Sequence, residues 1–128
     1  DLNIKTGWIV HNLMGYDELT TTSKNKFIEI KNDKISKIKI LDPKDFGFKR
    51  NKEADLRGGT AKENAFLMKN AFKGETGPIR DNIVLNSAAG LVISGKAKKF
   101  KEAINMVNYN IDNGHVINKL KSLIDSNE

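Results

Sequence analysis

The spacing of the apolar residues changes at about Lys52, and this change limits the possible folds more than any other feature of the 128-residue sequence. Before Lys52, apolar residues form short runs or alternate with polar ones, as in β-strands. After it they recur every three or four positions, which is typical of amphipathic helices. Strands followed by helices, with no repeat or low-complexity linker between them, predict one α/β domain in which helices cover a sheet.

Three segments of the first part are candidate strands. Residues 8–10 form a continuously apolar run, which predicts a strand buried on both faces, as in a parallel sheet. Residues 27–30 and 35–40 flank Asn32-Asp33 and predict a hairpin. Its turn type stays open, because Asn-Gly would be the stronger signal. Hairpin strands pair most easily with each other, so the buried strand is expected to lack neighbours.

Four helices are predicted in the second part. Thr60 and Glu63 form a capping box at the start of the first helix, which ends before Gly74. The second starts near Pro78 and ends before Gly95, and the third spans roughly residues 98–113, with the fourth directly after Gly114. The apolar residues that mark these helices are Ala65, Phe66, Leu67, Met68, Ala71 and Phe72 on a broad face of the first, Ile79, Ile83, Val84, Leu85, Ala88, Leu91 and Val92 on the stripe of the second, Phe100, Ala103, Ile104, Val107 and Ile111 on one face of the third, and Val116, Ile117, Leu120, Leu123 and Ile124 in the fourth.

The composition excludes several kinds of site. With no Cys and two His, the chain has no disulfide, no Cys-containing zinc site, no cysteine nucleophile and no His-rich site. A reducing compartment, the cytoplasm, is expected.

The longest apolar stretch, residues 83–93, is interrupted by polar residues and is shorter than the roughly 20 residues that span a bilayer. The N-terminus shows neither a secretory signal nor an initiator Met, so Asp1 is expected to lie inside a longer sheet domain.

The formal net charge of +6 is compatible with nucleic-acid binding. However, only three of the 22 basic residues are Arg, which is the residue favoured for bidentate recognition of phosphates and bases. Scattered Lys also solvates ordinary surfaces, and the Lys run within residues 96–101 is expected to be a solvated face at the start of the third helix. Nucleic acid is therefore not the expected partner.

The loop after residues 8–10 holds the best candidate site. It leaves the carboxyl end of the inferred strand, where open α/β sheets bind ligands. Asp17 and Glu18 are candidate Mg²⁺ ligands, because Mg²⁺ takes hard oxygens from one or two carboxylates and from substrate phosphates. Alternatively, they are solvated or cap the next turn, and residues 20–22 simply continue the loop.

His11 is a candidate acid or base, or makes one structural hydrogen bond. No nucleophilic triad is apparent, so no catalytic residue is predicted.

Three weaker candidates lie further along the chain. Residues 57–59 (Arg-Gly-Gly) form either a small anion-binding nest or a plain turn with two conformationally permissive glycines. They lack the length and the Lys of a P-loop, which favours the turn. Arg80 and Asp81 form either a functional pair or an exposed ion pair. His115, at the start of the fourth helix, is a weaker acid-base candidate than His11.

A string of short motifs extends over almost the whole chain, and none of them is specific alone. It comprises His11, Gly15-Tyr16-Asp17-Glu18-Leu19, Asp42-Pro43, Asp45-Phe46-Gly47, Asp55-Leu56-Arg57-Gly58-Gly59, Asn64-Ala65, Gly74-Glu75, Gly77-Pro78, Arg80-Asp81, Leu85-Asn86, Ala88-Ala89 and Leu91. In order and spacing, the string resembles the C-terminal portion of anthranilate phosphoribosyltransferase. The implied fold is the C-terminal portion of a nucleoside-phosphorylase/phosphoribosyltransferase-type domain, with a few strands, including a hairpin, followed by about four helices.

The resemblance implies that the complete enzyme transfers phosphoribosyl from phosphoribosyl pyrophosphate to the amino group of anthranilate, in tryptophan biosynthesis. Asp17 and Glu18 match the acidic pair with which the family holds Mg²⁺ on the pyrophosphate. The metal stabilises the negative charge that develops on the leaving group. The family's pairing through an N-terminal helical domain implies a homodimer for the complete enzyme.

The chain departs from the family pattern in two respects. Asn12 stands where the family usually has Gly, and Met14 and Tyr16 are larger than expected in that loop. The family's preceding segments G-T-G-G-D, N-I-S-T and K-H-G-N, its anthranilate-binding Arg and its helical domain do not occur in residues 1–128. The chain is therefore expected to be a partial phosphoribosyltransferase α/β domain that is inactive alone. The alternatives are a nucleic-acid-binding protein of this fold family, or an assembly protein whose partner supplies the missing strands.

Overall fold

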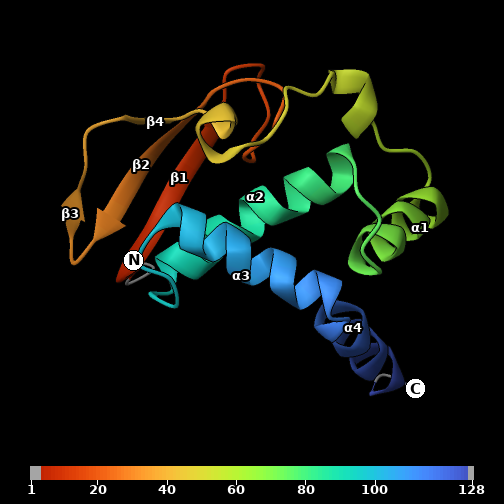
Figure 1. The fold of residues 1–128 in the computed structure, drawn as a ribbon. Helices are drawn as coiled ribbons and strands as arrows, with labels where there is room; N and C mark the ends of the chain where they lie inside the picture. The colour runs from red at the N-terminus through yellow and green to blue at the C-terminus, as the bar shows by residue number, and fades with distance from the viewer. Residues whose placement is uncertain (1–3, 127–128) are drawn as a thin grey trace.

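The computed structural model describes residues 4–126 and consists of one small sheet followed by four α-helices (Figure 1). This order confirms the predicted α/β class, and none of the helices within residues 4–126 is long and apolar enough to cross a membrane. The elements are β1 (Thr6–Asn12), β2 (Asn25–Lys31), β3 (Lys34–Ile35), β4 (Lys39–Leu41), the 3₁₀ turns η1 (Pro43–Phe46) and η2 (Glu53–Leu56), and the helices α1 (Ala61–Phe72), α2 (Pro78–Ile93), α3 (Phe100–Asp112) and α4 (His115–Asp125).

The sheet is antiparallel throughout: β1 pairs with β2, and β2 also pairs with β3 and β4. The predicted hairpin is confirmed. Its turn residues Asn32 and Asp33 have positive φ angles of 47° and 61°, as a type I′ turn requires. The predicted second strand is divided into β3 and β4, because the Ser36 side chain intervenes and its Oγ accepts the Glu29 N–H at 2.9 Å.

The prediction that residues 8–10 form a parallel strand buried on both faces is wrong. β1 is antiparallel to β2, and successive side chains of a strand point to opposite faces. Trp8 and Val10 pack against the core, whereas Ile9 between them is 60% exposed. A three-residue apolar run does not distinguish one covered face from two, and in the described part of the chain the helices lie on one side of the sheet (Figure 1).

Helices α2 and α3 form the layer that covers this inner face of the sheet. Leu85 and Ala89 of α2 join Leu19 and Leu41 in a buried cluster with the sheet. As predicted, the lysines within residues 96–101 are exposed where α2 leads into α3. A second cluster between α2 and α3 contains Val84, Ala88, Ala97, Ala103, Ile104, Val107 and Ile111.

Helices α1 and α4 lie away from the sheet, at the opposite side of the molecule (Figure 1). The predicted capping box is confirmed, since Thr60 Oγ1 accepts the Glu63 N–H at 3.3 Å and Glu63 Oε2 accepts the Thr60 N–H at 2.7 Å. The predicted apolar face of α1 is largely exposed. Within α1 only Ala71 is buried, and Phe66 is 64% exposed. The reason is position, because the main contacts of α1 are with the helices α2 and α4.

Candidate functional site

The loop between β1 and β2 carries the predicted metal ligands, and two fully buried asparagines organise it. Asn12 and Asn25 pair across the ends of the two strands, and Asn12 Nδ2 donates to Asn25 Oδ1 at 2.8 Å. Asn12 Oδ1 accepts the Met14 N–H at 2.9 Å and the Ser23 hydroxyl at 2.8 Å. One side chain therefore ties both ends of the loop together, and this is the structural role of Asn12.

Threonines that the sequence pattern treats as a simple continuation of the loop are part of the core. Thr20 and Thr21 are fully buried. Asn25 Oδ1 accepts the Thr20 N–H at 3.0 Å, and Asn25 Nδ2 donates to the Thr20 carbonyl at 3.1 Å. Thr21 Oγ1 accepts Asn51 Nδ2 at 2.9 Å. The only sequence signal for this network is the accumulation of Thr and Asn in the segment.

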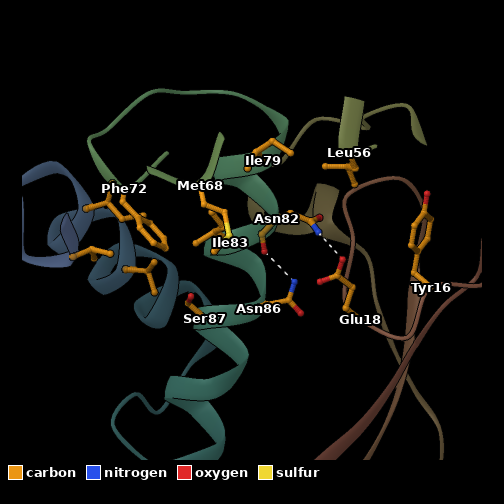
Figure 2. Close-up of a pocket in the computed structure, with 13 residues that line it drawn as sticks. Tyr16, Glu18, Leu56, Met68, Phe72, Ile79, Asn82, Ile83, Asn86 and Ser87 are labelled. Atoms are coloured by element: carbon orange, nitrogen blue, oxygen red, sulfur yellow. Dashed lines mark hydrogen bonds between the residues drawn. The ribbon is translucent and has the colours of Figure 1, made fainter. Parts of the chain in front are cut away.

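Two asparagines of α2 hold the same loop from the other side. Asn86 Nδ2 donates to the Leu19 carbonyl at 2.7 Å, and Asn86 Oδ1 accepts the Leu19 N–H at 3.2 Å. Asn82 Oδ1 accepts the Thr21 N–H at 3.2 Å, and Asn82 Nδ2 lies 3.4 Å from Glu18 Oε1 (Figure 2). Residues four positions apart lie on the same face of a helix. Sequence reasoning assigned neither asparagine a role at the loop, although both fix the backbone next to the acidic pair.

The acidic pair itself is open to solvent. The side chains of Asp17 and Glu18 are exposed, while partial burial and the negative charge of Asp17 raise the pKa of Glu18 above its ordinary value. Residues 4–126 contain no cluster of three or more His, Cys, Asp or Glu that could hold a metal ion. Two neighbouring carboxylates with open positions still suit Mg²⁺, which completes its shell with water and phosphate oxygens. The donor set therefore fits Mg²⁺ better than a metal that needs an all-protein cage.

A cavity of about 580 Å³ adjoins Glu18 (Figure 2). Glu18 and Asn82 are among its polar lining residues, and Ile83 of α2 contributes to its apolar lining together with Met68 and Phe72 of α1. Small-molecule sites in proteins have such volumes and such a mixture of apolar walls with a few polar groups. The arrangement can hold a cation and an anionic group at the loop, beside an apolar recess.

The turn at residues 57–59 does not form an anion nest. The Gly59 N–H donates to Asn64 Oδ1 at 2.8 Å, so this amide is already used within the chain. Neither Gly58 nor Gly59 has a positive φ, which makes the prediction of conformationally permissive glycines wrong. Gly59 instead allows close approach, because an added Cβ would meet the Glu63 carboxylate.

Arg80 is a structural residue. It is 9% exposed, and its ion pair is with Asp112 Oδ1 at 2.7 Å, so the alternative of an exposed ion pair with Asp81 is wrong. Its guanidinium also donates to the Gly74 carbonyl and to Asn108 Oδ1, each at 2.9 Å. Arg80 thus links the α1–α2 connection to α3.

Neither histidine lies in the candidate site. His11 is exposed, and no hydrogen bond joins its side chain to another residue within 4–126, so the expected structural hydrogen bond is not found. His115 Nδ1 lies 3.1 Å from Asn110 Oδ1 at the start of α4. The structure therefore brings neither ring to the acidic pair as an acid or base.

Residues 1–117 match the family described as "Glycosyl transferase family, a/b domain". The anthranilate phosphoribosyltransferase of Thermoanaerobacter sp. (strain X514) is 41% identical over 124 residues, which are 97% of this chain and 36% of that protein. The protein of that name from Petrotoga mobilis is 37% identical over 125 residues, or 98% of this chain and 36% of that protein.

Solved structures agree with these sequence matches. The crystal structure of anthranilate phosphoribosyltransferase from Thermus thermophilus has a TM-score of 0.82 and 30% identity, covering 91% of this chain and 34% of that chain. The Saccharomyces cerevisiae enzyme in complex with PRPP and Mg has a TM-score of 0.82 and 27% identity, covering 93% of this chain and 34% of that chain. The chain thus spans about a third of the length of its relatives, and the resemblance seen in the sequence is confirmed.

Proposed function

This chain belongs to the glycosyl transferase family, and from that premise we propose that it is the C-terminal part of an anthranilate phosphoribosyltransferase. The complete protein would transfer phosphoribosyl from phosphoribosyl pyrophosphate to the amino group of anthranilate, in the cytoplasm and as a homodimer. The observation that carries the proposal is the 41% identity, over 97% of the chain, to a protein of that name.

Asp17 and Glu18 are the residues that would hold Mg²⁺. Bound there, the metal would stabilise the negative charge on the departing pyrophosphate. The contribution of this chain is to fix the position of the two carboxylates. Asn86 holds Leu19 at both its N–H and its carbonyl, and Asn82 meets Glu18 itself. A rigid loop of this kind keeps charged ligands in place without reorganisation during the reaction.

The isolated 128-residue chain is expected to be inactive. The loop supplies half of a metal site, and the phosphate-binding and anthranilate-binding segments that the family resemblance implies do not occur in its sequence. Without them the chain would hold neither reactant in a reactive geometry. Anthranilate-dependent turnover by the pure 128-residue chain would refute this expectation.

The test of the function is a chimera in which this chain replaces the matching segment of the Thermoanaerobacter relative. The chimera should consume phosphoribosyl pyrophosphate only when anthranilate and Mg²⁺ are present. Asp17→Asn and Glu18→Gln should each lower kcat/KM by roughly 100-fold or more, the loss typical of removing one group that stabilises transition-state charge. The matched control is Asp125→Asn, which changes an exposed carboxylate at the C-terminal end of α4 and should leave turnover unchanged. Full activity in both loop variants would rule out the metal assignment.

A further inference from the structure

The turn between α3 and α4 contains Asn113-Gly114, the only Asn-Gly dipeptide in the sequence. Gly114 has a φ of 72°, in the left-handed region that glycine adopts without strain, so the turn favours a glycine at this position. The side chain of Asn113 is exposed to solvent. Neither residue belongs to the acidic loop or lines the cavity beside Glu18. The proposed function therefore leaves this dipeptide without a role.

An asparagine followed by glycine is chemically labile, because glycine has no side chain to hinder attack by its backbone nitrogen. The Gly114 nitrogen loses its proton to the solvent and forms a bond to Asn113 Cγ, while Nδ2 takes up a proton and leaves as ammonia. The product is a five-membered succinimide ring. Water then opens this ring at either of its carbonyl groups, which leaves aspartate or isoaspartate at position 113. The net reaction consumes water and releases ammonia, and it needs no enzyme and no oxidant.

The turn as it is folded opposes this reaction. The Gly114 N–H donates to the Ile111 carbonyl at 3.0 Å, so the attacking nitrogen is held at the end of α3. Asn113 Nδ2, the leaving group, donates to the Tyr109 carbonyl at 2.8 Å. The ψ of Asn113 is 10°, so its own backbone nitrogen, and not its Cβ, nearly eclipses the Gly114 nitrogen. The succinimide ring contains Cβ and needs the opposite arrangement, so ring closure requires a large rotation about this ψ.

Rotation about the ψ of Asn113 swings the whole of α4, because every later residue moves with it. No residue of α4 is buried, and Figure 1 shows the helix at the end of the molecule remote from the sheet. Val116, in the first turn of α4, packs against the core cluster that contains Val107 and Ile111. A helix with so few buried contacts detaches at a fraction of the free energy of global unfolding. Detachment of Val116 from the core therefore frees the Asn113-Gly114 turn.

We propose that Asn113 is a site of spontaneous deamidation whose rate is set by the docking of α4, where docked means that Val116 packs against the core. Modification accumulates with the time that α4 spends detached. The new carboxylate lies beside Asp112, at the C-terminal end of α3, where the helix dipole disfavours negative charge. The reaction also removes the Nδ2 bond to the Tyr109 carbonyl. Each modified molecule therefore holds α4 less firmly than before.

The test follows residue 113 by mass spectrometry of proteolytic peptides while the 128-residue chain is kept at constant pH and temperature. Asn105 and Asn118 are exposed on α3 and α4, and each precedes a larger residue, so they serve as internal controls. A synthetic peptide of residues 108–120, too short to form stable helices, gives the rate without docking. Fluorescence of Trp8, the only tryptophan, reports whether the chain is folded, because this residue packs against the core. Residue 113 is also followed in the chimera described above, so the result does not depend on folding of the chain alone.

In the folded protein, residue 113 should be modified about fivefold or more faster than either control because of Gly114, and about tenfold slower than in the peptide because of docking. Val116→Ala, which shortens the side chain that docks α4, should move the rate towards that of the peptide and leave Asn105 unchanged. Asn113→Gln should abolish the product, since a side chain longer by one methylene does not close the five-membered ring.

A rate at residue 113 no faster than at the controls overturns the assignment of the site. A rate in the folded protein equal to that of the peptide, or one that a folded Val116→Ala variant leaves unchanged, overturns control by docking. If Val116→Ala does not fold, hydrogen exchange in the unsubstituted protein decides. In urea below the unfolding transition, exchange of the Gly114 amide and modification of residue 113 should accelerate in parallel. Acceleration of one without the other overturns the proposal.

Discussion

Asn86 on α2 satisfies both backbone polar groups of Leu19, donating to its carbonyl at 2.7 Å and accepting its N–H at 3.2 Å. Leu19 is 1% exposed, so water does not replace these partners. A single amide side chain thereby connects the loop of the acidic pair to a helix more than 60 residues later in the chain. The positions of Asp17 and Glu18 depend on this connection.

Replacement of Asn86 by Ala should leave both polar groups of Leu19 buried and unpaired. The expected loss in the free energy of unfolding is about 2–3 kcal/mol, the cost of unsatisfied buried groups. Urea denaturation measures it. Asn105→Ala, on an exposed position of α3, is the control and should change stability by less than about 0.5 kcal/mol. Similar losses in both variants would mean that the contact with Leu19 contributes little.

Asn12 and Asn25 should be energetically coupled, because each supplies hydrogen bonds that keep the other's loop partners in place. In a double-mutant cycle with Asn12→Ala and Asn25→Ala, the interaction energy should be between about 0.5 and 3 kcal/mol. Additive effects of the two substitutions would show that the buried pair does not act as a unit. The single change Asn12→Gly should destabilise this chain, because the Met14 N–H loses its acceptor.

The acid stability of the fold should depend on Asp42. Burial raises the pKa of Asp42, but the Lys44 N–H and the positive charge of Arg50, 2.7 Å away, outweigh burial and leave this pKa below its ordinary value. A lowered carboxyl pKa stabilises the fold above the pKa of the unfolded chain, and this contribution disappears as the pH falls through the folded-state value. Unfolding free energy measured against pH should therefore fall less steeply on acidification in Asp42→Asn than in the unsubstituted chain. Asn105→Ala, an exposed change that alters no titratable group, is the control and should leave the slope unchanged.

The hairpin turn should respond to the conformation of Asp33. Its φ of 61° lies in the left-handed region, where a β-branched side chain costs about 1–2 kcal/mol. We expect Asp33→Val to lower the melting temperature, and Asp33→Gly, which creates the preferred Asn-Gly turn, to maintain or raise it. Thermal unfolding followed by circular dichroism distinguishes the two. A Val variant as stable as the Gly variant would contradict the type I′ geometry.

The sequence was sufficient to predict those parts of the structure that depend on interactions between residues close together in the chain. Thr60 and Glu63 satisfy each other's backbone groups locally, Pro78 suits a first helical turn, and the Asn32-Asp33 turn closes on itself. The hairpin and the ends of the helices could be predicted for this reason.

The rest depends on partners that are distant in the chain. Asn82 and Asn86 look like ordinary polar positions on an amphipathic helix, and their loop partners lie 61 to 67 residues earlier. Apolar spacing also shows which side of an element is apolar, but not whether another element covers it. Ile9 and Phe66 both sit in apolar runs, yet both are exposed, and the spacing alone could not predict this exposure. The acidic pair was a candidate from its place after a predicted strand and from the family resemblance, whereas the asparagines that hold its loop required the structure.

The loose attachment of α1 has a consequence for the cavity beside Glu18. Ala71 is the one buried residue within α1, whereas Leu85 and Ala88 of α2 are completely buried. Segments with few buried contacts open locally at a fraction of the global unfolding free energy. Backbone amides of α1 should therefore exchange their hydrogens with solvent much faster than those of α2. Because Met68 and Phe72 belong to the cavity wall, we expect the width of the recess to depend on the docking of α1 more than on any movement of the acidic loop.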